Sequence, residues 1–135
     1  MIFVYTDGAC RGNPGPMAIG ASIQDDTGKE LATVSNLIGD GTNNIAEYRA
    51  VIAGLEKAKS LGAREIELRI DSKLVVEQLN GRYKVKNERL KALHAQAIEL
   101  LSNFQSTVMH VPREQNQRAD ELANLAYIVP NGQAV

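Results

Sequence analysis

Residues 2–5 form an unbroken apolar run, Ile-Phe-Val-Tyr, near the beginning of the sequence. A strand that is apolar at every position is typical of the centre of a sheet, because other elements cover both of its faces. The run therefore predicts a central strand. A glycine- and proline-rich turn is expected over residues 8–16, followed by strands at 18–23 and 31–38 that the sequence Asp-Asp-Thr-Gly of residues 25–28 joins as a hairpin.

The apolar pattern then changes to a helical period. After a loop at residues 39–43, Asn44 can cap a helix that Gly62 ends. The apolar residues of this helix recur at helical spacing: Tyr48, Val51, Leu55, Ala58 and Leu61. Residues 65–71 alternate strictly between polar and apolar side chains, which predicts a strand with one polar face.

The second half of the chain predicts three more helices and one more strand. In order, we expect a short helix at 72–80 ended by Gly81, a longer helix capped by Asn87 with its stripe Leu90, Leu93, Ala97, Leu100 and Phe104, a strand at 107–111, a loop at 112–115, a helix at 116–127 and a loose tail at 128–135. The order βββ-α-β-α-α-β-α indicates an α/β domain with a mixed sheet, in which hairpins come first and parallel crossovers follow.

The 135 residues suffice for one domain, expected over residues 1–127, and a second domain would be too small to hold its own core. Cys10 is the single cysteine, so an intrachain disulfide is excluded and a reducing compartment fits. The first residues lack the features of a signal peptide, and no apolar run approaches the ~20 residues that span a bilayer. A cytoplasmic protein without a membrane partner is expected.

The formal net charge is −1, which is less basic than is usual for a protein dedicated to binding polyanions. If this chain binds nucleic acid, its basic charge must be local. Residues 82–91 hold five basic side chains and a single acid, Glu88. Such a run is most often just a solvated face, so it does not decide the question alone.

Chain topology predicts that four carboxylates meet at one edge of the sheet. If the strand at 65–71 runs parallel to the first strand, its end carries Asp71 to the edge at which Asp7 lies. The helix after the third strand starts at this edge with Glu47, and a parallel last strand brings Asp120 there as well. In open α/β sheets, ligands bind beyond the carboxyl ends of strands.

Each acid also has a purely structural interpretation. Asp7 with its following glycine can form a turn, and Asp71 can cap the short helix that follows it. Glu47 stands three residues after Asn44, which is the spacing of a capping box. Asp120 falls near a helix start, where the helix dipole favours an anion.

Taken together, the four carboxylates favour a metal site. Their mutual repulsion would destabilise the fold unless cations lie among them. Oxygen ligands without a histidine or cysteine cluster suit Mg²⁺ or Mn²⁺ rather than zinc. Two such ions about 4 Å apart can stabilise the attacking and leaving oxygens of a phosphoryl displacement, so metal-dependent phosphodiester cleavage is the leading hypothesis.

Four segments of the chain resemble the motifs of the type I ribonuclease H family, in family order. These segments are residues 5–16 (Tyr-Thr-Asp-Gly-Ala-Cys-Arg-Gly-Asn-Pro-Gly-Pro), 42–47 (Thr-Asn-Asn with Ala-Glu), 70–72 (Ile-Asp-Ser) and 116–123 (Asn with Arg-Ala-Asp-Glu-Leu-Ala). The resemblance spans residues 5–126, nearly the whole chain. An aspartate-glycine pair alone has no value as a signal, whereas the full set with this spacing is highly specific.

The resemblance implies a ribonuclease H-like five-stranded mixed sheet flanked by helices. It also implies endonucleolytic hydrolysis of the RNA strand of RNA–DNA hybrids with two Mg²⁺ ions, or Mn²⁺ in their place, leaving 5′-phosphate and 3′-hydroxyl ends. The metal ligands and catalytic carboxylates would be Asp7, Glu47, Asp71 and Asp120, with Asp7 bridging both ions.

The resemblance further implies which residues read the substrate. The turn from Cys10 to Gly15, with side chains such as Asn13, lies where the family contacts ribose 2′-hydroxyls in the minor groove, as does Glu47. Asn43 and Asn87 match family positions that contact the nucleic-acid backbone. Asn43 can instead satisfy its own loop, and Asn87 can simply cap a helix.

This sequence departs from the family pattern in two respects. Many members carry a basic, tryptophan-containing excursion between the third and fourth motifs, but this chain has no tryptophan and its residues 81–87 are too short for one. The auxiliary family histidine has two candidates here, because His110 aligns by counting and Arg113 lies in the expected loop. We favour Arg113, since strand alternation can hold His110 in the sheet, and we expect His94 to be a surface or boundary residue.

Other functions remain open at this point. The spacing of Gly8, Gly12 and Gly15 could suggest a phosphate-binding loop, but a strand rather than a helix follows and Pro14 and Pro16 interrupt it. A catalytically inactive nucleic-acid-binding module with the same fold is the alternative from another class. A nearer variant also cleaves double-stranded RNA, which presents the same ribose hydroxyls. The sequence does not identify a protein partner, although the missing excursion suggests weaker hybrid binding or reliance on one.

Overall fold

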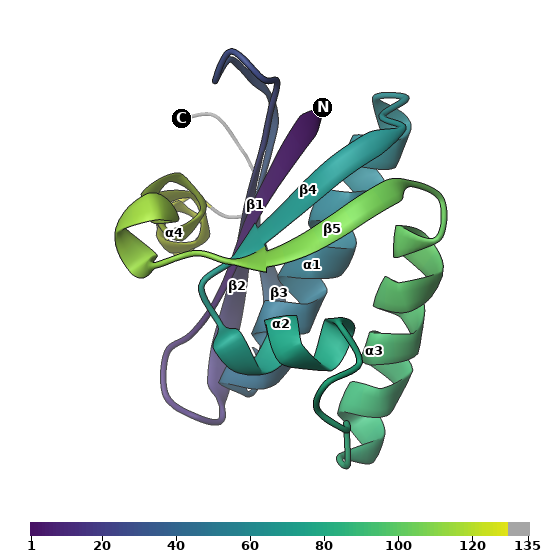
Figure 1. The fold of residues 1–135 in the computed structure, drawn as a ribbon. Coiled ribbons are helices and arrows are strands. Elements are labelled where there is room, and N and C mark those ends of the chain that lie inside the picture. The colour runs from purple at the N-terminus through teal and green to yellow at the C-terminus, as the bar shows by residue number, and fades with distance from the viewer. Residues whose placement is uncertain (130–135) are drawn as a thin grey trace.

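The computed structural model describes residues 1–129 and shows a sheet with helices on both faces (Figure 1). Its strands are β1 (Ile2–Cys10), β2 (Gly15–Gln24), β3 (Glu30–Gly41), β4 (Glu65–Ile70) and β5 (Gln105–His110). Its helices are α1 (Asn43–Ser60), α2 (Lys73–Leu79), α3 (Glu88–Leu101), the short 3₁₀ helix η1 (Arg113–Gln115) and α4 (Gln117–Leu125). The predicted order of elements is confirmed.

The five strands form one mixed sheet in the order β3-β2-β1-β4-β5. β1 is antiparallel to β2 and parallel to β4, and β4 is parallel to β5. The apolar run of residues 2–5 lies in the central strand, as its composition predicts. Along β4, Ile66, Leu68 and Ile70 are buried and alternate with more exposed residues, which confirms the predicted polar face.

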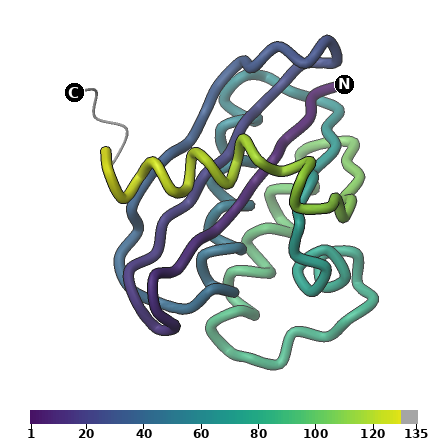
Figure 2. The backbone as a smooth tube through the Cα atoms, turned by 90° about the vertical axis from the view of Figure 1, so that its left-hand side faces the viewer, coloured from purple at the N-terminus to yellow at the C-terminus, as the bar shows by residue number. Residues whose placement is uncertain are grey.

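Helices α1, α2 and α3 lie on one side of the sheet, and α4 lies on the other side (Figure 1). Figure 2 shows α4 crossing the strands. Two glycines allow the close packing, because added Cβ atoms would lie 2.3 Å from the Ala46 carbonyl carbon at Gly8 and 2.2 Å from the Ala119 oxygen at Gly20. The sheet therefore holds α1 and α4 tightly on its opposite faces. Among the described residues, no helix is both long and apolar enough to cross a membrane.

The first hairpin is longer than the sequence predicts. β1 and β2 pair from Phe3 with Gln24 to Cys10 with Met17, so most of the expected turn at residues 8–16 belongs to the strands. The strands pair through backbone groups, and glycine contributes no side chain to an alternating pattern, so the sequence does not reveal that the strands continue. Asp7 consequently lies within a strand, and its interpretation as a turn residue is wrong.

The start of α1 also differs from the prediction. β3 continues to Gly41, and the cap is Thr42, whose Oγ1 accepts a hydrogen bond of 3.3 Å from the Ile45 N–H, rather than Asn44. Glu47 lies five residues after this cap, so it does not form a capping box. Likewise Ser72, not Asp71, caps α2, since its Oγ accepts from the Val75 N–H.

Other boundaries shift by a few residues. Asn87 caps α3 as predicted, but this helix ends at Leu101, before Phe104, and β5 begins at Gln105. The expected loop at 112–115 contains η1, and α4 ends at Leu125. Of the predicted loose tail, Ile128 and Val129 still donate backbone hydrogen bonds to the Leu125 carbonyl, and the rest lies outside the described residues.

Candidate functional site

The site begins where β1 and β4 separate. Thr6 is the last residue of β1 that pairs with β4, through Ile70, so Asp7 and Asp71 follow directly after the last paired positions. Asp7 is buried, with 7% of its surface exposed, while Asp71 is half-buried at the end of β4. The parallel alignment of two strands therefore brings two carboxylates to one edge, as the topology predicts.

Glu47 reaches this edge from the first turns of α1. The absence of a side chain at Gly8 lets the helix backbone approach β1, and the Gly8 N–H donates a hydrogen bond of 3.3 Å to Glu47 Oε1. One carboxylate oxygen from each of Asp7, Glu47 and Asp71 lies within 4.8 Å of the others. Three of the four predicted carboxylates thus converge closely enough to share a cation.

Asp120 lies in the first turn of α4, on the opposite face of the sheet from α1. It lines the same hollow as the three clustered carboxylates and contacts Asp7, but it does not belong to the tight group within 4.8 Å. The structure therefore brings all four predicted carboxylates to one site, with Asp120 at its side. Its position also fits the expected interaction with the helix dipole.

Burial and mutual repulsion make the metal-free cluster hold protons strongly. Burial, together with the charges of Glu47 and Asp71, raises the pKa of Asp7 to about 9. Burial is also the main reason that the pKa of Glu47 rises to about 8, and the charge of Asp71 raises it further. A divalent cation would compensate the charges that water cannot reach there.

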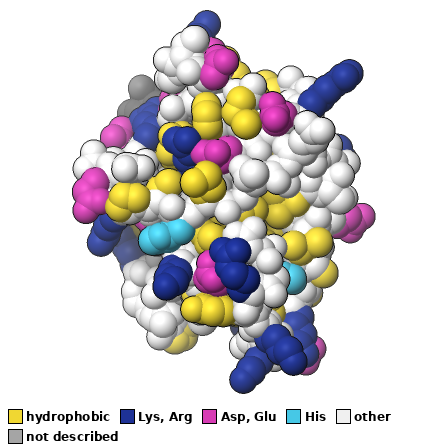
Figure 3. Space-filling model, viewed as in Figure 1, with side chains coloured by type: hydrophobic (Ala, Val, Ile, Leu, Met, Phe, Trp, Pro, Cys, Tyr) yellow, Lys and Arg dark blue, Asp and Glu magenta, His cyan; other side chains and the backbone are white. Residues whose placement is uncertain are grey.

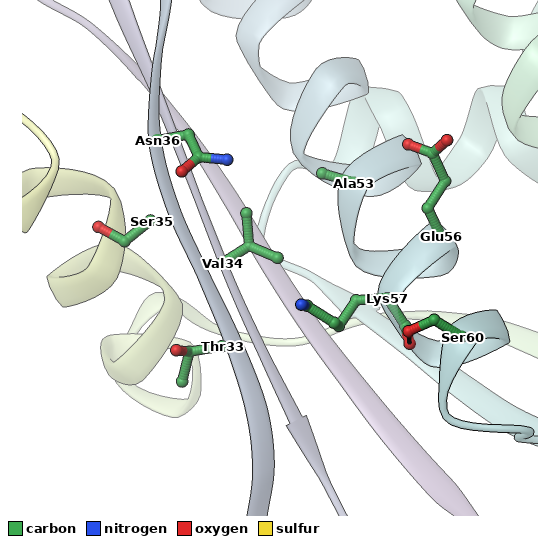
Figure 4. Close-up of a pocket in the computed structure, with 8 residues that line it drawn as sticks. All are labelled: Thr33, Val34, Ser35, Asn36, Ala53, Glu56, Lys57 and Ser60. Atoms are coloured by element: carbon green, nitrogen blue, oxygen red, sulfur yellow. Dashed lines mark hydrogen bonds between the residues drawn. The ribbon is translucent and has the colours of Figure 1, made fainter. Parts of the chain in front are cut away.

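The hollow at the carboxylates measures about 490 Å³. Its lining consists of Asp7, Gly8, Ala9, Cys10, Asn43, Glu47, Asp71, Arg113, Asp120 and Asn124. A larger hollow of about 570 Å³ lies between β3 and α1 and shares no residue with it (Figure 4). That second hollow contains one acid and one base, Glu56 and Lys57, without a cluster of carboxylates. The chemistry of the lining, not the size of the hollow, identifies the candidate site.

Arg113 and His110 occupy different surroundings near the site. Arg113 is exposed in η1 and lines the carboxylate hollow. His110 ends β5, and its Nε2 lies 3.2 Å from the backbone carbonyl of Asp71. His94 is half-buried on α3, with Nε2 3.0 Å from the Gln78 carbonyl, so it is the boundary residue that we expect.

The predicted substrate-binding residues divide into two groups. Cys10 and Asn43 line the hollow, and Asn13 adjoins it because its Oδ1 accepts a hydrogen bond of 3.1 Å from the Asn43 N–H. Asn87 does not line the hollow, and its Oδ1 accepts from the Arg89 and Leu90 N–H groups as a helix cap.

Asn124 is a lining residue that the sequence interpretation overlooks. Its Nδ2 donates a hydrogen bond of 3.0 Å to the Asp120 carbonyl, and it lies one helical turn after Asp120. The four-residue spacing within a helix could have indicated it, because residues at this distance share a face.

Comparison with known proteins agrees with this geometry. A family model described as reverse transcriptase-like matches residues 5–126. A ribonuclease HI of Halobacterium salinarum is 46% identical over 126 residues, which make up 93% of this chain and 63% of that protein. A bifunctional protein of Mycobacterium tuberculosis is 48% identical over 125 residues, and this chain spans only 34% of its length.

Solved structures show the same similarity in three dimensions. The crystal structure of RNase H1 from Halobacterium salinarum has a TM-score of 0.92 at 45% identity and covers 95% of this chain and 98% of its own. LC11-RNase H1, isolated from compost and solved in complex with an RNA/DNA hybrid, has a TM-score of 0.88 at 44% identity, covering 93% and 95%.

A five-stranded mixed sheet of this order, with carboxylates where its central strands separate, defines the ribonuclease H-like class of domains. The family match extends over most of the chain, and the similar solved structures are type 1 enzymes of this class. The chain belongs to the ribonuclease H family, type 1.

Proposed function

We propose that this protein is an endoribonuclease that hydrolyses the RNA strand of RNA–DNA hybrids with two divalent metal ions, leaving 5′-phosphate and 3′-hydroxyl ends. The observation that carries the proposal is the group of carboxylate oxygens from Asp7, Glu47 and Asp71 within 4.8 Å of one another. Similar proteins are named ribonuclease HI, and LC11-RNase H1 was solved with an RNA/DNA hybrid.

The residues present fit divalent metal ions. Glu47 Oε2 is buried and has no hydrogen-bond partner among residues 1–129, which would be costly for an ionised oxygen without a cation. The lining offers carboxylate and amide oxygens, the donors that Mg²⁺ and Mn²⁺ prefer. Asp7, Glu47, Asp71 and Asp120 would hold the ions, which supply an activated water and stabilise the leaving 3′-oxygen when bound.

Side chains around the carboxylates would bind and orient the substrate. Arg113 offers the hollow a positive charge, which suits a phosphate at the cleavage position. The turn that follows Cys10, together with Asn13 and Asn43, would face the ribose 2′-hydroxyls and the backbone of the hybrid. Asn87, which caps α3 and does not line the hollow, would contact the sugar-phosphate backbone of the hybrid.

The proposal is tested by cleavage of end-labelled substrates in parallel reactions with Mg²⁺, Mn²⁺ or EDTA. We expect the RNA strand of a hybrid to be cut with either metal, no cutting in EDTA and no cutting of double-stranded DNA. Asp71→Asn is the control for contaminating nuclease and should be inactive. A double-stranded RNA arm shows whether the substrate range is broader than hybrids.

Binding of the hybrid without cleavage under any metal would contradict the proposal. That result would indicate an inactive nucleic-acid-binding module with the same fold.

A further inference from the structure

Asn116 contacts the polypeptide beside two of the four carboxylates. It is buried, with 1% of its surface exposed, and immediately precedes α4. Its side-chain Nδ2 donates a hydrogen bond of 2.9 Å to the carbonyl of Thr6, the residue before Asp7. Its own carbonyl accepts a hydrogen bond of 3.1 Å from the Asp120 N–H. One residue therefore connects the backbone beside Asp7 with the backbone of Asp120.

Asn116 contacts β1 at the residue where the pairing between β1 and β4 ends. Thr6 is the last β1 residue that pairs with β4, so only β2 continues beside Asp7. Asn116 precedes α4, which lies on the opposite face of the sheet from α1 (Figure 1), and its amide contacts β1 at this point. Without this contact, the position of Asp7 relative to α4 would depend on apolar packing, on the close contact at Gly20 and on hydrogen bonds from β3 to α4, such as the one from Ser35 Oγ to the Leu122 carbonyl.

The oxygen of the Asn116 side-chain amide makes no comparable contact with the described residues. This atom, Oδ1, is buried without a hydrogen-bond partner in the described part of the chain. A buried unpaired acceptor costs stability, so the benefit of an asparagine here comes from its Nδ2 donor. That donor has one described target, the carbonyl next to Asp7.

We propose that Asn116 is a positioning residue that sets Asp7 relative to Asp120, so that both carboxylates can face the same divalent ions. The inference rests on the proposed function, because it assigns Asn116 to the metal site of that function. Residues that orient metal ligands without touching the metal commonly change metal affinity by about 10–100-fold when they are removed.

The test compares Asn116→Leu and Asn116→Ala with the wild-type protein. Leucine keeps the branched shape of asparagine but removes the hydrogen-bond donor. If the alanine variant fails to fold, the comparison relies on the leucine variant. Ser35→Ala is the matched control, since Ser35 Oγ also ties the sheet to α4 by donating to the Leu122 carbonyl at 2.7 Å, away from the carboxylates. Each protein is titrated with Mg²⁺ without nucleic acid, followed by NMR, and its melting temperature is recorded.

We expect Asn116→Leu to bind Mg²⁺ about tenfold more weakly or worse, while Ser35→Ala keeps the wild-type affinity even if both lower the melting temperature. On hybrid substrate, kcat should fall with KM within about twofold of the wild-type value, because the reacting centre rather than substrate binding is disturbed.

Wild-type Mg²⁺ affinity in a folded Asn116→Leu protein, or an equal loss in Ser35→Ala, would overturn the inference and leave the proposed function standing. A wild-type protein that neither binds Mg²⁺ nor cleaves a hybrid would remove the proposed function itself, and the inference with it.

Discussion

Asp7 and Glu47 are acidic side chains that the fold holds close together with little access to water. Carboxyl groups in such surroundings keep their protons to a higher pH than in the unfolded chain. The pKa of Asp7 rises to about 9 and that of Glu47 to about 8. Both shifts therefore have measurable consequences for the stability of the metal-free protein.

The stability of the metal-free protein should fall as the pH rises. Because the folded-state pKa values are raised, the two groups contribute stability that is fully present below about pH 4 and is lost as the pH passes 8 to 9. Asp7→Asn should flatten this dependence and at pH 9 should exceed the wild-type unfolding free energy by at least ~1.4 kcal/mol, the equivalent of one pKa unit. Urea unfolding in EDTA across pH 5–9 measures it, and parallel curves would contradict the pKa shifts.

Glu47→Gln should abolish most of the activity while leaving the fold intact. The amide keeps the size of the side chain but loses the charge that attracts a cation, so we expect a loss of about two to four decades in kcat. Single-turnover cleavage of a labelled hybrid measures this loss. Glu56→Gln on the same helix is the control, because Glu56 is exposed and lines the other hollow; equal losses in both variants would argue against a specific role for Glu47.

At the scale of single residues, sequence patterns predict which carboxylates meet at the site better than they predict which residues cap the helices. The direction of the strands predicts the edge at which the four acids lie, because it determines where β1 and β4 end and where α1 and α4 begin. Thr42 and Ser72 act as caps in place of Asn44 and Asp71, since cap choice depends on the residue at which the preceding strand ends. Sequence patterns do not single out Asn116 as a positioning residue, because its contact joins segments far apart in the sequence. They do not single out Asn124 as a lining residue either, because that role depends on which face of α4 meets the site.

At the scale of elements, the sequence pattern predicts every strand and α-helix in order, but it does not predict the short helix η1 and it underestimates the length of β1 and β2. Both strands continue through glycine-containing segments, where pairing depends on the backbone rather than on a side-chain pattern. Gly8 and Gly20 also allow α1 and α4 to approach the sheet closely enough to bring Glu47 and Asp120 to the site. Close approach of this kind is a three-dimensional property that one sequence does not reveal.

Gly20→Ala should displace α4 and reduce activity. Its Cβ would lie 2.2 Å from the Ala119 oxygen and 2.4 Å from the Ala123 nitrogen, so the helix must move. We expect a loss of about 1–3 kcal/mol in unfolding free energy, as for other overpacked sites, with a fall in kcat because Asp120 moves too. Urea denaturation and cleavage rates measure the two effects.

Gly28→Ala separates the two effects of the previous variant. Gly28 has a positive φ of 85° and open space around it, so alanine there should cost about 1–2 kcal/mol through backbone strain alone. Its kcat should equal that of the wild type. If Gly20→Ala loses stability but keeps the wild-type kcat, the close packing of α4 on the sheet is not required for activity.

At the scale of the whole molecule, the charges are nearly balanced and the basic ones are unevenly placed. Exposed basic side chains occupy the loop between α2 and α3 and the start of α3, which form the lower end of the molecule in Figure 3. They are Arg82, Lys84, Lys86, Arg89 and Lys91. This local charge offers phosphates a contact that the net charge of −1 does not suggest.

The affinity for an RNA–DNA hybrid should therefore depend on the basic residues between α2 and α3. Neutralising Lys84 and Lys86 to glutamine should weaken binding at low salt and lower the slope of log K against log salt by about one per lost phosphate contact. Lys57→Gln and Lys59→Gln on α1 provide a control of equal charge. Filter binding measures both, and an unchanged salt slope would exclude the segment from the interface.

The missing tryptophan-containing excursion suggests a further comparison in the same assay. We hypothesise that this chain binds hybrid more weakly than relatives that carry the excursion, or relies on a partner protein. An affinity equal to that of such relatives would contradict this hypothesis.

Anomalous X-ray diffraction would show whether Asp7, Glu47, Asp71 and Asp120 hold divalent ions. Crystals of the wild-type protein and of Asp71→Asn would be grown with Mn²⁺ and an RNA–DNA hybrid whose RNA strand carries non-hydrolysable linkages, so that the substrate stays intact. We predict two anomalous peaks within ligand distance of the wild-type carboxylates and at least one peak lost in Asp71→Asn. A wild-type crystal with the hybrid in place and no anomalous peak among these carboxylates would show that they do not hold the metal ions.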